Sequence, residues 1–295
     1  MARCLSTNSV ETVDLSYNSF IPPDGNQINK PLVILHGLFG SKRNWLSLSK
    51  AFMRDVKRPV YALDLRNHGE SPHKAPMTYV DMAADVTNFL HEHSLRDITL
   101  IGHSMGGKVA MAVALSSSLP SGTLETLIVE DIAPVKGRLD GDFIKYVKAM
   151  KRVEQSNVST RKEVIEILGQ AEKTDQRSPT KDPAVLQFLS TNIQFPPAVE
   201  KLRFIIPLDI LEQYVPSLGD FPYDPTENQW SGPTLFVKGE HSRFINDRNV
   251  GCTKEFFPNS EVVSLPTGHW VHAQRPHDFK DVVLKFMREH SKHSS

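Results

Sequence analysis

The sequence predicts an α/β fold in which a mostly parallel central sheet is flanked by helices and carries an inserted helical cap. Along the first 135 residues, short continuous apolar runs alternate with segments of helical periodicity, which is typical of strands buried on both faces. Residues 136–230 differ, because charged helical segments there alternate with proline-containing loops; strand-like runs then resume. We therefore expect a core formed by residues 1–135 and 231–295, interrupted by a cap of residues 136–230.

The composition favours a globular protein without a strongly charged surface. Of 295 residues, 39% are hydrophobic, and 34 Lys and Arg balance 34 Asp and Glu. With no net charge, the protein has no overall electrostatic attraction for nucleic acid or an anionic membrane. No apolar run approaches the roughly 18–20 residues of a membrane span. Cys4 and Cys252 have neither CxxC spacing nor metal-like spacing with histidine. We expect an intracellular protein with no metal, no cofactor, no nucleic-acid partner and no transmembrane segment.

The elements before residue 98 follow from apolar runs and from periodicity. Alternating apolar and polar residues predict an edge strand first, and two continuous apolar runs predict buried strands. Apolar residues at i, i+3 and i+7, as at Trp45, Leu48 and Phe52, predict helices that pack on the sheet. In chain order we predict a strand at Val10–Tyr17, a strand at Leu32–Leu35, a helix at Lys42–Phe52, a strand at Pro59–Leu65 and a helix at Thr78–His93.

The stretch Ile98–Val109, ITLIGHSMGGKV, combines an apolar run, a Gly-x-Ser-x-Gly turn and the start of a helix. A serine hydroxyl is a poor nucleophile unless it is exposed beside a base, and this spacing exposes it on a strained strand-to-helix turn. Gly102 and Gly106 leave room for the backbone to pass closely through the turn. Ser104 is therefore the candidate nucleophile, and the alternative is an ordinary turn with a helix-capping serine.

A second glycine turn, His36–Ser41, follows the strand predicted at Leu32–Leu35. Acyl transfer at a serine requires backbone N–H groups that bind the negative oxygen formed during the reaction. We expect these donors to be the N–H groups of Leu38 and of Met105, which follows the candidate nucleophile at a helix start. His36 is expected to order its turn by hydrogen bonding and not to react.

Charged residues follow two further strands. The turn Asp64–Ser71 contains Arg66 and His68, and we expect it to be a structural loop tied by Asp and Arg hydrogen bonds. The strand predicted at Leu124–Val129 leads into Asp131. Because the carboxyl ends of parallel strands share one edge of the sheet, Asp131 is expected on the same edge as the candidate nucleophile.

The expected cap contains helices predicted at Phe143–Val153 and Arg161–Ala171. Its apolar residues should form mainly the interior of the cap, and some should face the nucleophile, where they would exclude water and shape an acyl pocket. They include Phe143, Tyr146, Met150, Phe188, Leu189, Phe195 and Phe204.

The chain after the cap supplies a candidate base. His269 lies on a loop between the last predicted strand and the last predicted helix, so its ring can lie over the same sheet edge as Ser104. His241 and His272 are the alternatives. The predicted elements here are a strand at Pro233–Val237, a helix at Asn246–Phe257, a strand at Glu261–Leu265 and a helix at Asp278–Glu289.

Four motifs carry a resemblance to a known family: HGLFGSKRNW, LDLRNHGESPH, GHSMGGK and VEDIAPV. Together with Gly-His-Trp near the end, they make the chain from about Val10 to Met287 resemble the α/β-hydrolases, and within these one family of serine hydrolases. That family contains bacterial short-chain esterases, the fungal ethanol acetyltransferases and an animal mitochondrial hydrolase linked to 2-oxoacid dehydrogenase function. The resemblance implies an α/β-hydrolase fold, a Ser-Asp-His triad and a mitochondrial location, with the cytoplasm as the alternative.

The resemblance also bears on the acid of the triad. In many α/β-hydrolases the acid stands three residues after the glycine that closes the strand following the cap, and this chain has Ser242 there. In the family that the chain resembles, the acid comes from the Asp-Ile-Ala-Pro segment, which implies Asp131. Glu130 and Glu240 are the reserve candidates, and Glu130 is less suitable because neighbouring strand residues point to opposite faces.

These residues predict a serine-dependent acyl-transfer enzyme. His269 would deprotonate Ser104, the hydroxyl would attack an ester or thioester carbonyl, and Asp131 would orient His269. Water would then release the acyl group as an acid, whereas an alcohol would form a new ester. The resemblance implies short acyl groups, with acetyl-CoA and ethanol as candidate substrates for ethyl acetate formation. The alternative hypothesis is a catalytically slow protein of this fold that binds or protects a mitochondrial enzyme complex.

Overall fold

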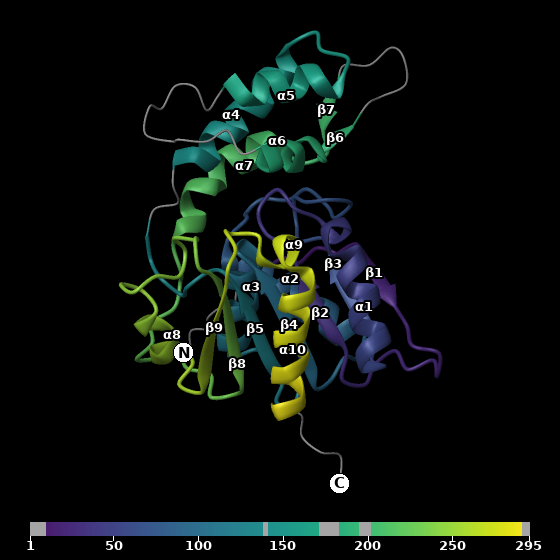
Figure 1. The fold of residues 1–295 in the computed structure, drawn as a ribbon, viewed down its shortest axis with the longest axis vertical. Coiled ribbons are helices and arrows are strands. Elements are labelled where there is room, and N and C mark those ends of the chain that lie inside the picture. The colour runs from purple at the N-terminus through teal and green to yellow at the C-terminus, as the bar shows by residue number, and fades with distance from the viewer. Residues whose placement is uncertain (1–9, 138–140, 171–182, 195–201, 291–295) are drawn as a thin grey trace, which may run out of the picture.

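A seven-stranded sheet, in the order β1-β3-β2-β4-β5-β8-β9, forms the centre of the molecule (Figure 1). The computed structural model describes residues 10–137, 141–170, 183–194 and 202–290. Neighbouring strands are parallel except β1, which pairs antiparallel with β3 at one edge. The strands are β1 (Tyr17–Phe20), β2 (Leu32–Leu35), β3 (Val60–Leu63), β4 (Ile98–His103), β5 (Leu124–Glu130), β8 (Thr234–Gly239) and β9 (Ser260–Leu265). The predicted fold class is therefore confirmed.

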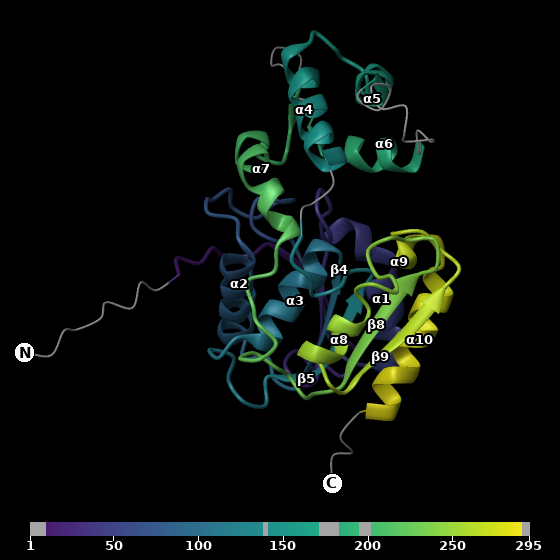
Figure 2. The same ribbon diagram turned by 90° about the vertical axis from the view of Figure 1, so that its left-hand side faces the viewer.

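Helices cover both faces of the sheet (Figure 2). Leu32 and Ile34 pack with α1 and α10 on one face, whereas Val33 and Leu35 pack with α2 and α3 on the other. This alternation is the period-2 pattern of a strand buried on both sides. The helices are α1 (Leu46–Val56), α2 (Tyr79–Glu92), α3 (Met105–Leu115), α8 (Gly251–Phe256), α9 (Val271–Gln274) and α10 (Pro276–His290). No helix among the described residues has the length and apolar composition that a membrane span needs.

A further layer of helices, which we call the cap, lies beyond the carboxyl ends of the parallel strands (Figure 1). Two of its helices, α4 and α5, match those predicted from periodicity, although Ala171 lies outside the described residues. The sequence-predicted limits of the cap, 136 and 230, stay a prediction. The elements of the cap are α4 (Gly141–Gln155), α5 (Arg161–Gln170), α6 (Pro183–Ser190), β6 (Ile193–Gln194), β7 (Arg203–Phe204) and α7 (Leu208–Tyr214).

Lys108 on α3 ties together the two chain segments that join the cap to the sheet layer. Its Nζ donates to the carbonyl oxygens of Val135, Gly219 and Asp220 at 3.0, 2.8 and 2.9 Å. Val135 precedes α4, and Gly219 and Asp220 follow α7. One buried ammonium group therefore binds both of the segments that connect the cap to the sheet layer. Burial lowers the pKa of Lys108 to about 8.

The edge strand predicted at Val10–Tyr17 is wrong in position, because β1 begins at Tyr17. Val13 is buried, as an alternating strand requires. However, its backbone N–H donates to the side chain of Asp85, with 2.8 Å between N and Oδ1, and not to a neighbouring strand. The burial pattern is that of a strand, but the hydrogen bond is that of a loop.

Two predicted helices are divided or shortened. The helix predicted at Lys42–Phe52 begins as a 3₁₀ turn at Lys42–Trp45, and α1 follows it. The helix predicted at Asn246–Phe257 is helical only in its second half, α8. In the first half, the side-chain amides of Asn246 and Asn249 donate to nearby carbonyl oxygens at 2.7 and 2.9 Å. These local bonds compete with helical hydrogen bonds.

Candidate active site

Ser104 stands in the turn between β4 and α3. Its backbone has φ 52° and ψ −116°, a strained conformation for a residue with a side chain. The two glycines permit the close crossing: a Cβ on Gly102 would lie 2.2 Å from the carbonyl oxygen of Gly106, and a Cβ on Gly106 would lie 2.4 Å from that of His36. The structure therefore has the sharp strand-to-helix turn that the Gly-x-Ser-x-Gly spacing predicts.

His269 lies between Ser104 and Asp131. Its Nε2 atom is 2.9 Å from Ser104 Oγ, and its Nδ1 atom is 2.7 Å from Asp131 Oδ2. When Nδ1 carries the proton and donates it to the buried carboxylate, Nε2 is left as the acceptor for the serine hydroxyl. The structure thus brings together the three side chains that the sequence names as nucleophile, base and acid.

The orientation of Asp131 depends on the chain path after β5. Asp131 has φ 51°, and its N–H donates to the carbonyl oxygen of Val237, 2.9 Å away. Its Oδ1 accepts from the N–H of Gly239 at 3.0 Å, and its Oδ2 accepts from the hydroxyl of Ser242. With the ring of His269, three donors therefore fix this carboxylate. Sequence reasoning missed the contact with Ser242. A serine at that position indicates only that the acid lies elsewhere, and it gives no signal that the hydroxyl binds the acid.

The other candidate acids and bases lie elsewhere. Glu130 points away from Asp131. Its Oε1 accepts from the backbone N–H and from Nδ1 of His272, both at 2.8 Å. The ring of Trp45 stacks on His272, with 4.2 Å between centroids. Glu240 is exposed, and His241 is exposed at the rim of the cavity described below. None of these four candidates takes part in the hydrogen bonds that join Asp131, His269 and Ser104.

His103 supports the loop that carries His269. Its Nε2 lies 3.0 Å from the carbonyl oxygen of His269, and its ring lies 4.7 Å from that of His269 and 4.9 Å from that of His272. Burial lowers the pKa of His103 well below its usual range. His103, Glu130 and His272 also bring one potential metal-ligand atom each within 4.8 Å of one another. The hydrogen bonds of these groups account for the cluster, which holds residues 269–272 against the sheet.

Leu38 and Met105 lie close to Ser104: Met105 follows it in the chain, and a Cβ on Gly37, the residue before Leu38, would lie 3.3 Å from the Cβ of Ser104. Met105 is the first residue of α3, where N–H groups have no partner in the helix and the helix dipole favours negative charge. Leu38 lies in a turn closed by the N–H of Gly40 and the carbonyl oxygen of Gly37, 3.0 Å apart. Within the described residues, neither N–H group has a hydrogen-bond partner, so both are available to a ligand.

Two buried histidines hold this turn from behind. The carbonyl oxygen of Gly37 accepts from Nδ1 of His36 at 2.8 Å, and Nε2 of His36 accepts from the N–H of Leu65 at 3.0 Å. His68 Nε2 accepts from the N–H of Phe39 at 3.2 Å. Burial lowers the pKa of His36 and lowers that of His68 to about 3, so both rings are neutral acceptors at pH 7. His36 therefore orders its turn by hydrogen bonding.

The charged turn at Asp64–Ser71 is a structural loop. Arg66 is fully buried and its Nε donates to Asp85 Oδ2 at 2.5 Å. Asp64 accepts from the backbone N–H of Lys42 at 2.6 Å, and from its ammonium group at the same distance. These Asp and Arg bonds direct Arg66 to Asp85 on α2, as the expectation of a structural loop requires.

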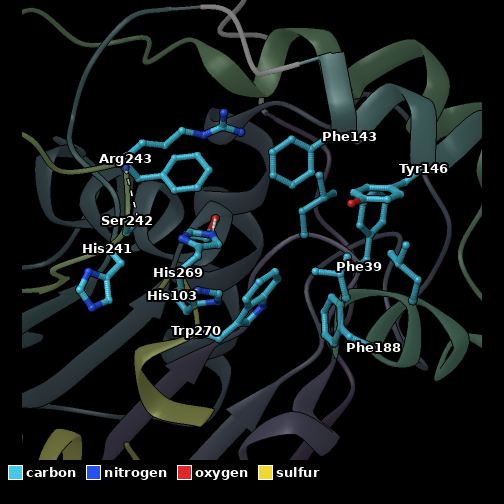
Figure 3. A pocket seen from close by; sticks show the side chains of 15 residues that line it. Phe39, His103, Phe143, Tyr146, Phe188, His241, Ser242, Arg243, His269 and Trp270 are labelled. Atoms are coloured by element: carbon cyan, nitrogen blue, oxygen red, sulfur yellow. Dashed lines mark hydrogen bonds between the residues drawn. The ribbon is translucent and has the colours of Figure 1, made fainter. Parts of the chain in front are cut away.

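A cavity of about 550 Å³ lies between Ser104 and the cap. Figure 3 shows the aromatic rings of the cap facing the ring of His269 across this space. Met150 and Phe204 are buried within the cap, and Phe195 lies outside the described residues. The apolar cap residues predicted from sequence that do line the cavity are Phe143, Tyr146, Phe188 and Leu189.

Comparisons with known proteins agree with the fold of this chain. The chain is 37% identical to sn-1-specific diacylglycerol lipase ABHD11 of Xenopus laevis, over 96% of this chain and 86% of that protein. It is 30% identical to ethanol acetyltransferase 1 of Cyberlindnera fabianii, over 94% of this chain and 87% of that protein. A solved structure of a marine microorganism esterase is 32% identical, with a TM-score of 0.79, and covers 93% of this chain and 100% of its own. The family described as the alpha/beta hydrolase fold matches residues 30–276, so the chain belongs to that family and the resemblance stated from its motifs is confirmed.

Proposed function

We propose that this chain is a serine ester or thioester hydrolase that forms an acyl-enzyme at Ser104. Its membership of the alpha/beta hydrolase family supports a hydrolase or acyltransferase in general. The observation that carries the more specific proposal is the continuous chain of hydrogen bonds from Asp131 through His269 to Ser104, beside a cavity whose wall from the cap is apolar. A nucleophile, its base and the group that orients the base have this arrangement in serine hydrolases.

In the proposed acylation step, Ser104 Oγ attacks the substrate carbonyl carbon while its proton passes to His269 Nε2. The negative carbonyl oxygen accepts hydrogen bonds from the N–H groups of Leu38 and Met105. Asp131 holds the Nδ1 proton of His269 and stabilises the positive charge that forms on the ring. The bond to the leaving alcohol or thiol then breaks, and the leaving group takes the proton from His269.

In the second step, an acceptor oxygen attacks the acyl carbon and His269 again takes the acceptor's proton. The bond between the acyl carbon and Ser104 Oγ then breaks, and His269 returns the proton to Oγ. Water gives the free acid, whereas an alcohol gives a new ester, so one site supports both outcomes. Alcohol transfer is the second candidate function. The similarity to ethanol acetyltransferase 1 of Cyberlindnera fabianii, and to a Saccharomyces cerevisiae protein named "Probable alcohol acetyltransferase", favours it. For that reaction we propose acetyl-CoA and ethanol as the substrates.

The cavity suggests which acyl groups the site takes. Its volume of about 550 Å³ falls within the range of about 300–1,000 Å³ for small-molecule sites, which is far more space than an acetyl group needs. The aromatic wall from the cap favours an apolar acyl chain over a charged one. We therefore propose that acetyl esters are accepted and that longer apolar acyl esters bind more tightly. The mitochondrial location implied by the resemblance stays a prediction.

Product analysis tests the proposal. Purified protein is incubated with acetyl-CoA, with an acetyl ester and with an octanoyl ester, each with and without ethanol, beside Ser104→Ala. Free acid formed only by the wild type supports the hydrolase, and ethyl ester formed only by the wild type supports alcohol transfer. Equal product from both proteins contradicts the role of Ser104. Absence of product, together with no labelling of Ser104 by a fluorophosphonate, would support the alternative of a binding or protective protein.

A further inference from the structure

The turn that carries the N–H of Leu38 is strained at the next residue, Phe39. The bond between Gly37 and Gly40 makes Phe39 the third residue of a four-residue turn, and its φ is 62°. That conformation is typical of glycine or asparagine, because a Cβ is crowded there. A strained residue of this kind persists only where its surroundings hold it in place.

Two side chains hold the backbone of Phe39, and they come from different layers of the molecule. From the sheet layer, His68 Nε2 accepts the N–H of Phe39 at 3.2 Å. From the cap, the side-chain amide of Asn192 donates to the carbonyl oxygen of Phe39 at 2.8 Å. The same amide also lies 3.4 Å from the carbonyl oxygen of Leu189, so two acceptors fix its orientation. Asn192 is buried, which strengthens its bond by excluding water.

Asn192 also lies next to the wall of the cavity. It follows α6, whose residues Phe188 and Leu189 line the space above Ser104. The ring of Phe39 lines the same space, 6.4 Å from the ring of Phe143 on α4, and Figure 3 shows these rings on one side of the cavity. The cap wall that would contact an acyl chain is therefore fastened to the turn that carries Leu38.

We propose that Asn192 is a positioning residue that couples the cap to the oxyanion site, that is, to the N–H groups of Leu38 and Met105 that would bind the negative oxygen. Its hydrogen bond keeps Phe39 in the strained conformation, and that conformation closes the Gly37–Gly40 turn, which presents the N–H of Leu38 to the developing negative oxygen. An acyl chain that packs against the α6 wall stabilises this arrangement, so a longer acyl group raises kcat and does not only lower KM. The inference rests on the proposed acyl-enzyme at Ser104.

The test compares Asn192→Ala with Thr191→Ala. Thr191 is the matched control because it is exposed in the same turn as Asn192. Its hydroxyl donates to the carbonyl oxygen of Phe188 and not to the Gly37–Gly40 turn. Steady-state kinetics are measured with p-nitrophenyl acetate and p-nitrophenyl octanoate. Asn192→Ala should lower kcat for octanoate by about tenfold or more, part of the 10²–10³-fold that loss of an oxyanion donor costs, with KM within threefold. The ratio of octanoate to acetate kcat should fall toward one, whereas Thr191→Ala should retain both the rate and the ratio.

A second variant separates this role from simple loss of packing. In a Phe39→Gly background the positive φ costs little, so adding Asn192→Ala should lower kcat by less than about threefold. An equal loss in both backgrounds would overturn the proposal, as would a rise in KM with kcat and the chain-length ratio unchanged. If Ser104→Ala is as active as the wild type, the proposed function fails. If activity depends on Ser104 but not on Asn192, only the present inference fails.

Discussion

Two acid–histidine pairs lie side by side at the end of β5, and they differ in what surrounds them. Asp131 pairs with His269 at 2.7 Å, and Glu130 pairs with His272 at 2.8 Å. Both carboxylates are buried, and both histidines come from residues 269–272. The first pair opens on Ser104 and the cavity, whereas the second is covered by the ring of Trp45.

The difference shows that an acid beside a histidine does not by itself make a catalytic site. Glu130 is the last residue of β5 and pairs with His272 under the ring of Trp45, whereas Asp131 lies just beyond the strand. The positive φ of Asp131 turns the chain where β5 ends and directs this carboxylate to the cavity side. The same interaction therefore serves a proposed reaction on one face and holds the histidine loop on the other.

The largest expected effect is on the pair that faces Ser104. Asp131→Asn should lower kcat by about 10³–10⁴-fold, because an amide no longer orients the ring or stabilises its positive charge. Glu240→Gln, at the exposed reserve candidate, should change kcat by less than twofold. Steady-state ester hydrolysis measures kcat for both variants. Equal losses of kcat would contradict the assignment of Asp131 as the acid.

A smaller loss is expected when the support of this pair is weakened. Ser242→Ala removes one of the three donors to Asp131 and leaves Gly239 and His269 in place. We expect kcat to fall by about three- to tenfold, in line with the roughly 1 kcal/mol of one net hydrogen bond. Unchanged kcat would show that the other two donors suffice.

The pair on the opposite face should respond in stability and not in rate. Glu130→Gln keeps an acceptor for the N–H of His272 but removes the carboxylate, so kcat should change by less than threefold. The free energy of unfolding should fall by about 1–3 kcal/mol, because a buried partner is lost. Urea denaturation beside ester hydrolysis measures both quantities. A rate loss as large as that of Asp131→Asn would mean that both pairs take part in the reaction.

His103 contacts both His269 and His272, and its protonation should make the stability of the protein depend on pH. Its pKa in the folded protein is lowered by burial and then by its two neighbouring histidines, so below pH 6.5 the unfolded chain binds more protons than the folded one. Stability should therefore fall as the pH falls from 7.5 to 5, by up to about 1.4 kcal/mol per pH unit from this group. Urea midpoints of His103→Asn should show a shallower slope. His91→Asn, at an exposed histidine, should retain the wild-type slope.

Local patterns predicted much of the fold and the candidate residues. The run before Ser104 and the glycines around it predict both a strand and a turn, because such turns are set by a few neighbouring residues. Val13 shows the limit of this reasoning, since its alternating burial was right but its hydrogen-bond partner, Asp85, lies 72 residues away. Choosing Asp131 as the acid needed the resemblance, because spacing alone left Glu130 and Glu240 open.

Contacts between distant segments could not be predicted. The bond from Asn192 to Phe39 spans 153 residues, and that from Ser242 to Asp131 spans 111. No local periodicity records such a pairing, because it depends on how the cap and the loops after the strands pack in three dimensions. The positive φ of Phe39 could not be predicted from the sequence either, because only glycine or asparagine would indicate that backbone conformation.

The most direct test of the account is labelling with a fluorophosphonate, followed by intact-mass and peptide analysis. We predict a single adduct, located on Ser104, that forms at the same rate in the wild type and in Glu130→Gln. It should form much more slowly in Asp131→Asn and not at all in Ser104→Ala. An adduct at another residue, or equal slowing in Glu130→Gln and Asp131→Asn, would contradict the claim that one of the two acid–histidine pairs activates Ser104.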